Sequence, residues 1–462
     1  TDKLQWKVKH HTDFRNEENF LETILLDNGV KEDDIAGFLH PTKKYVNNPL
    51  LMTNMAEAVS MVHKHLKNNG KIFVKVDADV DGFSSSAALI QFLQSVNPSI
   101  EVEYMLNYEK QHGLTFEDLS NFTKDRFDLI IIPDASMTVQ DARTIKNNFS
   151  AEVLVLDHHL VENEFYDNIT HKWINREEAK QIYAADKERL IVDKYTNYCT
   201  AVNCTDGTYP NPHLSGAGVV QKFIEAYLNE YEVTEEIDSS LREKYLDLIS
   251  LALIADNMDL RSLENRYYVL EGMKERNCNN EFINELVERN AEDMKWGRYI
   301  ISMGWQIAPK INGCIRYGKD EEQLDTFRAM LGIQEDREYQ PRRKHKEDPL
   351  PPKEIHSLQK TMARVCENIK SRQDTEVRKF VTELEKEIEK NHLDKNSVLF
   401  VDGTKVLTKG TTTGLVANKL ASKYFRPVVL LRSKSALEYG GSMRGYDKGI
   451  ITNTKEFLEN AG

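Results

Sequence analysis

Short apolar runs alternate with helical stretches between residues 71 and 259. The runs are KIFVKV at 71–76, EVEYML at 101–106, FDLIIIPDAS at 127–136 and AEVLVLDHH at 151–159. Runs that are almost wholly apolar are typical of strands buried on both faces, so they predict a parallel sheet covered by helices. Helical patterning is present in SSSAALIQFLQSV, where we expect serines at the helix start, and in GVVQKFIEAYL and KYLDLISLALIADN.

The rest of the chain is organised differently. Residues 164–213 are polar and irregular, and predict an excursion with a turn or hairpin, while 340–352 resembles a linker. Apolar side chains at helical spacing then predict one long connecting helix that runs to about residue 392; they are Ile355, Leu358, Met362, Val365 and Ile369. A second α/β unit follows, with strands NSVLFVDG and PVVLLRS around the turn KGTTTG and the helix LVANKLASKYF.

The predicted fold class is α/β, with a parallel-sheet domain joined by a long helix to a smaller α/β domain. We expect the limits to be 1–340, 341–392 for the linker and long helix, and 393–462. A length of 462 residues suits two or three domains. We expect neither a membrane span nor a signal peptide, because no run of about 18 apolar residues occurs and the first residues are polar.

Charge and cysteine content refine this prediction. The net charge of −13 argues against a protein that coats nucleic acid by bulk charge, although 393–462 holds eleven Lys or Arg against six Asp or Glu, and QPRRKHK at 340–346 is basic. Of the five cysteines, only Cys199 and Cys204 are close in sequence, without a matching second pair. We therefore expect free thiols in a reducing cytoplasm rather than a zinc site or a disulfide.

Acidic and imidazole side chains gather where four predicted elements end. They are Asp77, Asp79 and Asp81; Asp134; Asp157, His158 and His159; and Asp256. Singly, an aspartate after a strand is an ordinary turn residue or cap, and Asp256 has the alternative of ending a helix. Together they are informative, because the carboxyl ends of parallel strands converge on one edge of a sheet, where α/β folds bind ligands.

This residue set predicts a metal centre. Carboxylates with imidazole and no nearby cysteine suit Mn²⁺, the preferred ion here, or Mg²⁺, and less selectively Zn²⁺ or Fe²⁺. Six such groups exceed the need of one ion, so we expect two divalent metal ions. Two ions about 3.5–4 Å apart can clamp an in-line phosphoryl displacement and lower the pKa of a bridging water.

Four motifs carry a family resemblance. DADVDG, PDAS, LDHH and ADNMDL resemble, in this order, the motifs of the DHH phosphoesterase superfamily. More of the chain resembles one branch, the RecJ single-strand exonucleases, in HPTKKYVNNPLLMTNMAEAV, LSGAGVVQKF, ENRYYVLEGM and IAPKINGCIRYG. GGSMRG resembles the Gly-Ser-x-Arg motif of the DHH-associated C-terminal domain, so the resemblance covers residues 38–449.

The resemblance implies a role for each matching residue. The implied metal ligands are Asp79, Asp81, Asp134, His158 and Asp256, with Asp134 bridging both ions and Asp77 joining the first site or tuning it. His159 would act on the scissile phosphate, and Asp157 would orient a histidine. Asn312 and Arg316 would hold the strand backbone, while Ser442 and Arg444 would contact phosphates near the terminal nucleotide. Lys405 and Lys409 are weaker candidates, with plain surface lysines as the alternative.

The chain also departs from the family pattern. Lys75 and Val76 stand where many relatives have His-Gly or Tyr-Gly, the fourth motif ends in Met-Asp-Leu where proline is frequent, and Gly445 replaces a common serine. Many bacterial RecJ proteins continue into an oligonucleotide-binding barrel, and we expect a compact form without it, as in a phage or mobile-element nuclease. Strand binding would then be weaker or depend on a protein partner, such as a single-strand-binding protein or a helicase.

The resemblance implies a 5′-to-3′ exonuclease acting on single-stranded DNA, with RNA left open. An alternative is a DHH phosphodiesterase acting on short oligoribonucleotides or cyclic dinucleotides, and another is hydrolysis of pyrophosphate. The signature around Arg316 and the long middle section favour a polymeric substrate. A binding module with a lapsed site is disfavoured, because every motif acid is present. Oligomeric state stays open.

Overall fold

The computed structural model describes residues 17–446 apart from 109–110, 175, 232–234, 293, 295–298, 344, 408–409 and 434–437, together with 454, 457 and 458. The polar start of the chain and Lys409 therefore lie outside the described residues. None of the described helices has the length and apolar composition needed to cross a bilayer.

Five parallel strands form the central sheet, which confirms the predicted fold class. They are β1 (Ile72–Val76), β2 (Val102–Leu106), β3 (Leu129–Pro133), β4 (Glu152–Asp157) and β8 (Thr200–Asn203), in the order β2-β1-β3-β4-β8. The last strand was not predicted. Its four residues lie inside the polar excursion, and they extend the sheet by pairing Leu154–Asp157 of β4 with Thr200–Asn203.

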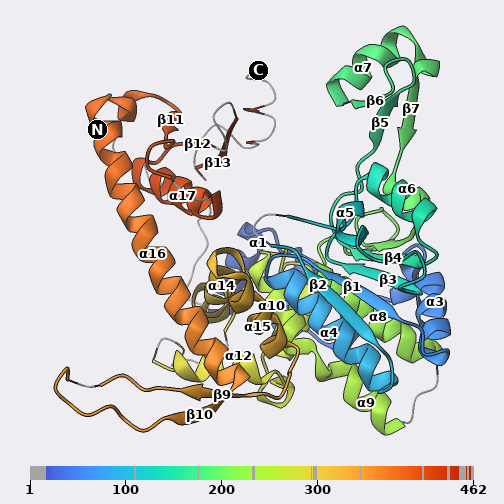
Figure 1. The fold of residues 1–462 in the computed structure, drawn as a ribbon, viewed down its shortest axis with the longest axis horizontal. Coiled ribbons are helices and arrows are strands. Elements are labelled where there is room, and N and C mark those ends of the chain that lie inside the picture. Colours follow the sequence, from blue (N-terminus) through green and yellow to red (C-terminus); the bar gives the residue numbers. More distant parts are fainter. Residues whose placement is uncertain are drawn as a thin grey trace.

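Helices cover both faces of this sheet (Figure 1). One face packs against α3 (Met55–Lys67), α4 (Val80–Val96) and α8 (Gly216–Glu230), with α10 (Leu246–Ala255) behind them. The other face carries α5 (Phe116–Leu119) and α6 (Val139–Asn148). The side chains of β1 alternate accordingly, since Val74 and Val76 belong to the larger core and Phe73 to the smaller one.

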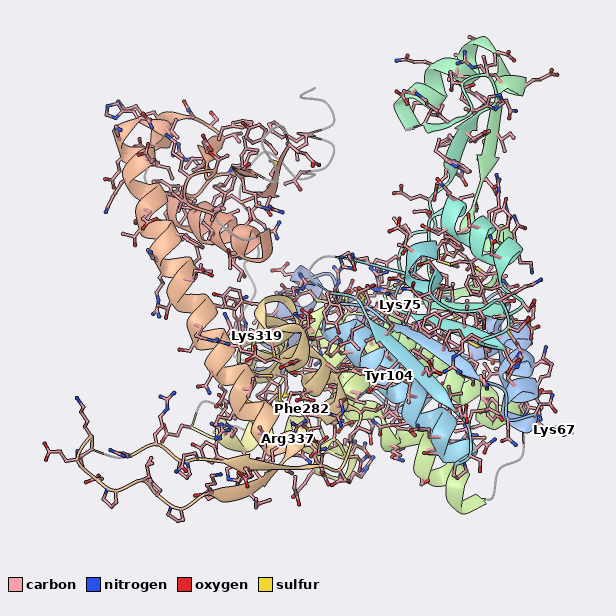
Figure 2. All side chains as sticks on the ribbon, in the orientation of Figure 1. Lys67, Lys75, Tyr104, Phe282, Lys319 and Arg337 are labelled. Carbon is pink, nitrogen blue, oxygen red and sulfur yellow. The ribbon has the colours of Figure 1, made fainter. Side chains whose placement is uncertain are left out.

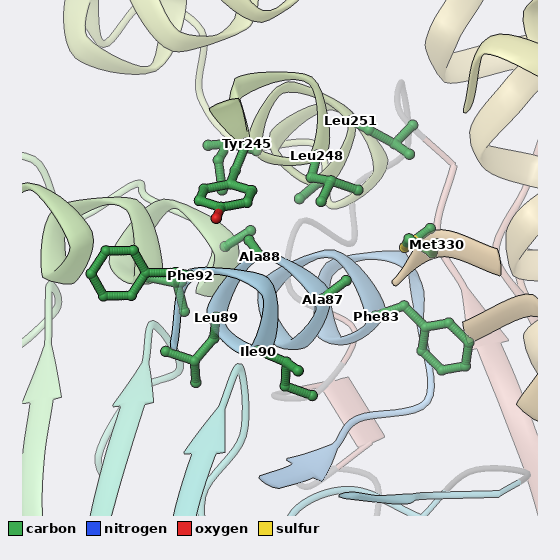
Figure 3. Close-up of a cluster of buried hydrophobic side chains, with 14 of the residues drawn as sticks. Phe83, Ala87, Ala88, Leu89, Ile90, Phe92, Tyr245, Leu248, Leu251 and Met330 are labelled. Carbon is green, nitrogen blue, oxygen red and sulfur yellow. The ribbon is translucent and has the colours of Figure 1, made fainter. Parts of the chain in front are cut away.

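Helix α4 lies at the centre of the larger core. Figure 3 shows Phe92 and Tyr245 packed near one end of this helix and Phe83 with Met330 near the other. The helix begins at Val80, four residues before the predicted start at Ser84. Asp79 is the N-cap, and its carboxylate accepts a hydrogen bond from the backbone N–H of Gly82. The helix dipole therefore begins inside the acidic motif rather than after it.

The polar excursion builds an arm that projects from the main body (Figure 1). It contains a three-stranded antiparallel sheet in the order β6-β5-β7, made of β5 (Glu164–Asp167), β6 (Lys172–Ile174) and β7 (Leu190–Asp193), with α7 (Arg176–Ala185) at its tip. Arg189, directly before β7, donates two hydrogen bonds to Asp167, of 2.6 and 2.5 Å, and so ties the start of β7 to β5. The predicted turn or hairpin is thus a small sheet with a helix.

Helices dominate the segment before the long helix. They are α11 (Leu263–Gly272), α12 (Glu281–Arg289), α13 (Ile300–Ser302), the π-helical turn η7 (Met303–Ile307), α14 (Ala308–Tyr317) and α15 (Asp320–Met330). Three further helices lie elsewhere: α1 (Glu17–Asp27), α2 (Ile35–Leu39) and α9 (Glu235–Lys244). Among these elements, α12, α14 and α15 all pack against the helix that leads to the smaller unit.

The predicted linker at 340–352 is the tip of a β-hairpin. Strand β9 (Asp336–Tyr339) pairs antiparallel with β10 (Glu354–Ser357), and Figure 2 shows Arg337 at the base of this hairpin. Ile355 was predicted to open the long helix, and this was wrong, because it lies in β10 with its side chain 63% exposed. A strand of four residues is too short to show a period of its own, so Ile355 was assigned to the long helix that follows.

The long helix α16 (Leu358–Lys390) belongs to two cores. Its first half, from Leu358 to Ile369, packs in the large core, and its second half, from Val377 to Ile388, packs in the core of the smaller unit. That unit has the sheet β11 (Leu399–Asp402), β12 (Val428–Ser433) and β13 (Tyr439–Arg444), covered by α17 (Thr413–Tyr424). The connecting helix is confirmed, while the domain limits at 340 and 392 stay predictions.

Candidate metal centre and nucleic-acid interface

The carboxyl edge of the sheet gathers the predicted ligands. Three overlapping groups have ligand atoms within 4.8 Å of one another. The groups are Asp77, Asp79 and Asp134; Asp81, His158 and Asp256; and Asp134, Asp157, His158 and His159. Every residue predicted as a metal ligand is in at least one group, and Asp134 and His158 each belong to two. The structure therefore brings together side chains that are up to 179 positions apart in sequence.

Asp134 lies at the centre of this cluster. The residue is 2% exposed and has a φ of 61°, a left-handed conformation that is costly for a residue with a side chain. Its Oδ1 lies 3.2 Å from Nε2 of His158 but accepts a hydrogen bond from none of the described groups. Burial and the neighbouring carboxylates raise its pKa well above the usual value. A cation bound at this oxygen would satisfy both the charge and the empty acceptor.

Asp81 is held from the opposite side by α8. Its two carboxylate oxygens accept hydrogen bonds from the backbone N–H groups of Gly216 (2.7 Å) and Ala217 (2.8 Å). Burial raises the pKa of Asp81 to about 6. A Cβ placed on Gly216 would come within 2.3 Å of the Cβ of Asp134, so only glycine fits at this position. The glycine-rich stretch noted in the sequence thus positions two ligands at once.

His158 connects the strand-derived ligands with Asp256. Its Nε2 lies 3.7 Å from Oδ2 of Asp81 and 3.7 Å from Oδ2 of Asp256. Asp256 is the C-cap of α10 and does not follow a strand. The alternative interpretation of the sequence, in which Asp256 ends a helix, was therefore right about the position of this residue. The side chain of Asp256 still reaches the cluster. A helix terminus thus completes a ligand set that strands begin.

Asp77 differs from the other acids because its oxygens are already engaged. Oδ1 accepts hydrogen bonds from Asn107 Nδ2 (3.1 Å) and from the N–H of Gly113 (3.3 Å), and Oδ2 lies 2.8 Å from Nδ1 of His112. Burial opposes ionisation of Asp77, but these hydrogen bonds outweigh it and lower the pKa. Of the two predicted roles, tuning the first site fits these contacts better than direct ligation. His112 was missed, since a lone histidine before a glycine carries no metal-binding spacing.

Lys75, the main departure in the first motif, does not disturb the cluster. Its side chain is buried, and Nζ lies 3.0 Å from Oδ1 of Asp118 in α5. Desolvation lowers the pKa of Lys75. Lys75 therefore holds α5 beside the strand, and Asp77 holds the segment that precedes α5.

His159 has a well-defined orientation. Its Nδ1 lies 2.8 Å from Oδ1 of Asp157, which also accepts a hydrogen bond from the backbone N–H of His158 (2.8 Å). The hydrogen bond with Asp157 raises the pKa of His159 to about 9. The ring is more than half exposed, so it is accessible to a ligand. The contact agrees with the expectation that Asp157 orients a histidine, and the catalytic role of His159 stays a prediction.

A cavity of about 450 Å³ adjoins the cluster. Its lining includes His112, Leu114, Asp134, Met137 and His159. The two histidines thus flank a space whose wall includes the central acid of the candidate metal centre.

Helix α14 brings a cation to the same edge. Nη2 of Arg316 lies 3.2 Å from Oδ2 of Asp79. Asn312, one turn earlier, has a buried Oδ1 that accepts no hydrogen bond from the described residues. These two residues, which were predicted to bind the backbone of a nucleic-acid strand, lie on the helix that borders the cluster. A guanidinium here can bind a phosphate with two parallel hydrogen bonds.

Ser442 and Arg444 lie together in the smaller unit. A Cβ placed on Gly414 would lie 2.7 Å from an Arg444 guanidinium nitrogen and 3.7 Å from Oγ of Ser442. These side chains therefore flank the first turn of α17, where Thr413 has a buried Oγ1 without a described partner. Helix N-termini of this kind attract anions. The 3-10 turn η9 (Gly410–Thr412), which precedes α17, approaches α14 across the gap between the units.

None of the five cysteines, all of which lie in the described part of the chain, forms a disulfide or belongs to a group of side chains that could hold a metal ion.

Comparison with known proteins agrees with the geometry. The family described as "DHH family, N-terminal domain" matches residues 71–253. YorK, an SPbeta prophage-derived protein of Bacillus subtilis whose name describes a single-strand DNA-specific exonuclease, is 30% identical over 452 residues, which cover 97% of this chain and 70% of YorK. The single-stranded-DNA-specific exonuclease RecJ of the same bacterium is 24% identical, over 92% of this chain and 46% of RecJ.

Solved structures give the same fold. An exonuclease RecJ bound to manganese has a TM-score of 0.58 and 17% identity, over 82% of this chain and 80% of that one. RecJ of Thermus thermophilus in complex with Mn²⁺ has a TM-score of 0.56 and 17% identity, over 82% of this chain and 46% of that one.

Proposed function

The chain belongs to the RecJ-like branch of the DHH family, and from this premise we propose that it is a metal-dependent exonuclease that degrades single-stranded DNA from the 5′ end. The observation that carries the proposal is the Oδ1 of Asp134, a buried acceptor that receives no hydrogen bond from the described residues, on an aspartate that belongs to two of the three ligand groups. The names of YorK and RecJ support the substrate.

The donor set fits two divalent cations, Mn²⁺ or Mg²⁺. Asp77, Asp79 and Asp134 form one group, while Asp81, His158 and Asp256 form another. Oxygen and imidazole ligands without cysteine suit these hard ions. When bound, a pair of such ions supplies an activated water and neutralises charge on the phosphoryl group that is transferred. The manganese and magnesium in RecJ structures support this assignment.

The protein's own residues would position the strand. His159, held by Asp157 and protonated at neutral pH by virtue of its raised pKa, would donate a hydrogen bond to the scissile phosphate. Arg316 and Asn312 would bind the backbone near the metal edge, and Ser442 and Arg444 would bind phosphate near the strand end. Backbone contacts carry no sequence information, so cleavage would tolerate any sequence and weaken with salt.

The experiment is digestion of a DNA oligonucleotide labelled at either end, with Mn²⁺, Mg²⁺ or EDTA. We expect a 5′ label to appear first in mononucleotides, a 3′ label to shorten stepwise, and EDTA to stop both. Early release of the 3′ label would contradict the polarity. The same series in RNA decides between the two polymers, and cleavage confined to two- to five-mers would favour the short-oligonucleotide alternative.

We further propose that the protein works in the cytoplasm. Accessory proteins such as a single-strand-binding protein or a helicase fit a substrate that must be single-stranded. Pull-down of either protein with the Asp134→Asn variant loaded on DNA tests this. Equal recovery on DNA that carries no Asp134→Asn protein would contradict a direct partnership.

A further inference from the structure

Trp305 is a large apolar residue that is 76% exposed. It lies in the π-helical turn η7, whose Met303 and Ile307 are buried in the large core. Ile301, four residues earlier, is 74% exposed. Because Met303 and Ile307, two positions away on either side, are buried, the exposure comes from the face that Trp305 occupies and not from a frayed end. Two large apolar side chains so close together on a surface indicate a binding site.

The turn that carries Trp305 is fixed next to the candidate metal centre. A Cβ placed on Gly304 would lie 3.1 Å from Cγ2 of Ile254. Ile254 is two residues before Asp256, the ligand that caps α10. π-Helical turns inside helices are frequent at functional sites. The backbone that presents the indole is therefore packed against the helix that presents a metal ligand.

The helical repeat continues from Trp305 to the strand-binding residues. Asn312 and Arg316 are four residues apart on one face of α14, and Trp305, seven residues before Asn312, falls near the same face even though η7 winds more slowly than an α-helix. This face ends at Arg316, whose guanidinium contacts Asp79. Eleven positions at a rise of ~1.5 Å place Trp305 roughly 16 Å from Arg316 along the axis. This is the span of a few nucleotides in an extended strand.

We propose that Trp305 is a stacking site for a nucleobase of the strand whose backbone is held at Arg316 and Asn312, with Ile301 extending the apolar surface. The inference rests on the proposed function, because it takes single-stranded nucleic acid as the ligand. Continuity with the residues at the metal edge favours this ligand over a protein. An indole stacks on any base, so the site adds affinity without sequence preference.

The test is binding of fluorescein-labelled oligothymidylate, measured by anisotropy with Asp134→Asn as the non-cleaving background. We expect Trp305→Ala to weaken binding by roughly five- to a hundredfold, and Trp305→Phe to restore most of it. Trp173→Ala is the matched control, because Trp173 lies in the arm against Tyr166. It should bind as the background protein does.

Single abasic sites, moved along the oligonucleotide, separate a base contact from a general effect. With Trp305 present, we expect one position at which base removal weakens binding, and with Trp305→Ala we expect no further loss at that position. The salt dependence should keep its slope in Trp305→Ala, since stacking releases no counterions. Equal affinity of Trp305→Ala and the background protein for every oligonucleotide would overturn the proposal, and would also be the result if Trp305 bound a protein instead.

The two proposals fail in different ways. If the wild-type protein does not cleave single-stranded DNA, the proposed function falls, whereas the abasic scan still measures stacking directly. If the wild-type protein cleaves, and Trp305→Phe keeps the abasic profile of the background protein while Trp305→Ala loses it, an aromatic ring is sufficient, as proposed. If all three profiles coincide, only the stacking site is overturned.

Discussion

The guanidinium of Arg316 contacts the carboxylate of Asp79, with Nη2 and Oδ2 3.2 Å apart. Asp79 is also the N-cap of α4, so one carboxylate faces a helix terminus and an arginine. The pair is partly exposed, and its contribution to stability is small. A metal ion at Asp79 would compete with Arg316, which would leave the guanidinium free for a phosphate. The contact thus predicts that Asp79 pairs with Arg316 in the metal-free protein and with the metal ion once it is bound.

Arg316→Ala should weaken binding of single-stranded DNA to a similar degree for every sequence. Loss of one phosphate contact should lower the slope of log affinity against log salt by about 1. Anisotropy titrations at several salt concentrations measure this. Arg126→Ala is a suitable control, because Arg126 pairs with Glu103 in β2. An unchanged salt slope in Arg316→Ala would contradict a phosphate contact.

Asp134→Asn should abolish cleavage while the fold is kept. Metal ions supply several kcal/mol of transition-state stabilisation, so we expect a loss of roughly a thousandfold or more in rate. Without metal, the variant should melt at a higher temperature than the wild type, because it lacks the buried carboxyl group whose ionisation is opposed by burial and by the neighbouring carboxylates. Mn²⁺ should no longer raise its melting temperature.

Asp402→Asn is the matched control for this variant, since Asp402 also ends a strand but lies outside the cluster. A full response of Asp134→Asn to Mn²⁺ would contradict the central position of Asp134.

Stabilisation by metal should grow as the pH rises through about 6. The pKa of Asp81 is about 6 in the folded chain and near 3.8 when unfolded, so the folded state holds the extra proton between these values. The metal-free chain therefore loses about 3 kcal/mol from this group as the pH rises through that window. Bound Mn²⁺ requires the ionised carboxylate of Asp81, so metal binding restores the stability that the metal-free chain loses. Melting curves with and without Mn²⁺ from pH 5 to 8 test this, and a larger metal effect at pH 5 would contradict it.

Asp157→Asn should move the alkaline limit of activity. With the pKa of His159 at about 9, the imidazolium persists at neutral pH and is lost as the pH rises through 9. The amide oxygen of the new side chain can still accept the two backbone hydrogen bonds, but the negative charge that favours the imidazolium is gone. The pH at which activity falls on the alkaline side should therefore move from about 9 towards 7. Rates from pH 6 to 10 measure it. If activity falls at the same alkaline pH in both proteins, His159 does not act as a cation.

Lys75→Met should lower stability without affecting metal binding. The change leaves Asp118 without its buried cation, at a cost of about 1–3 kcal/mol. Urea unfolding measures the loss, and the double variant Lys75→Met/Asp118→Asn should recover part of it. The rise in melting temperature with Mn²⁺ should be retained. Loss of that response would mean that Lys75 supports the first site directly.

The sequence predicted the sheet and its ligand-bearing edge because the chemistry is local there. An apolar run followed by an acidic residue predicts a buried strand with a polar end, whatever the rest of the chain contains. This prediction was right for the strands that lead to Asp134 and Asp157. Asp256 was found through the order of the motifs, although its element was a helix and not a strand.

Features made by tertiary contacts could not be predicted in this way. The strands at 200–203, 336–339 and 354–357 are too short to show a period, and α4 begins early because Asp79 caps it. The pairing of Asp77 with His112 and the exposure of Trp305 depend on segments that meet only in the folded chain.

Gly216 has a consequence for how inactive relatives are recognised. Since a single methyl group there would collide with Asp134, the centre can be destroyed by a mutation that leaves all its acids and histidines unaltered. A survey that scores only the DHH motifs would count such a protein as competent. Glycine at this position should therefore be checked alongside the ligands whenever a homologue is classed as active or inactive.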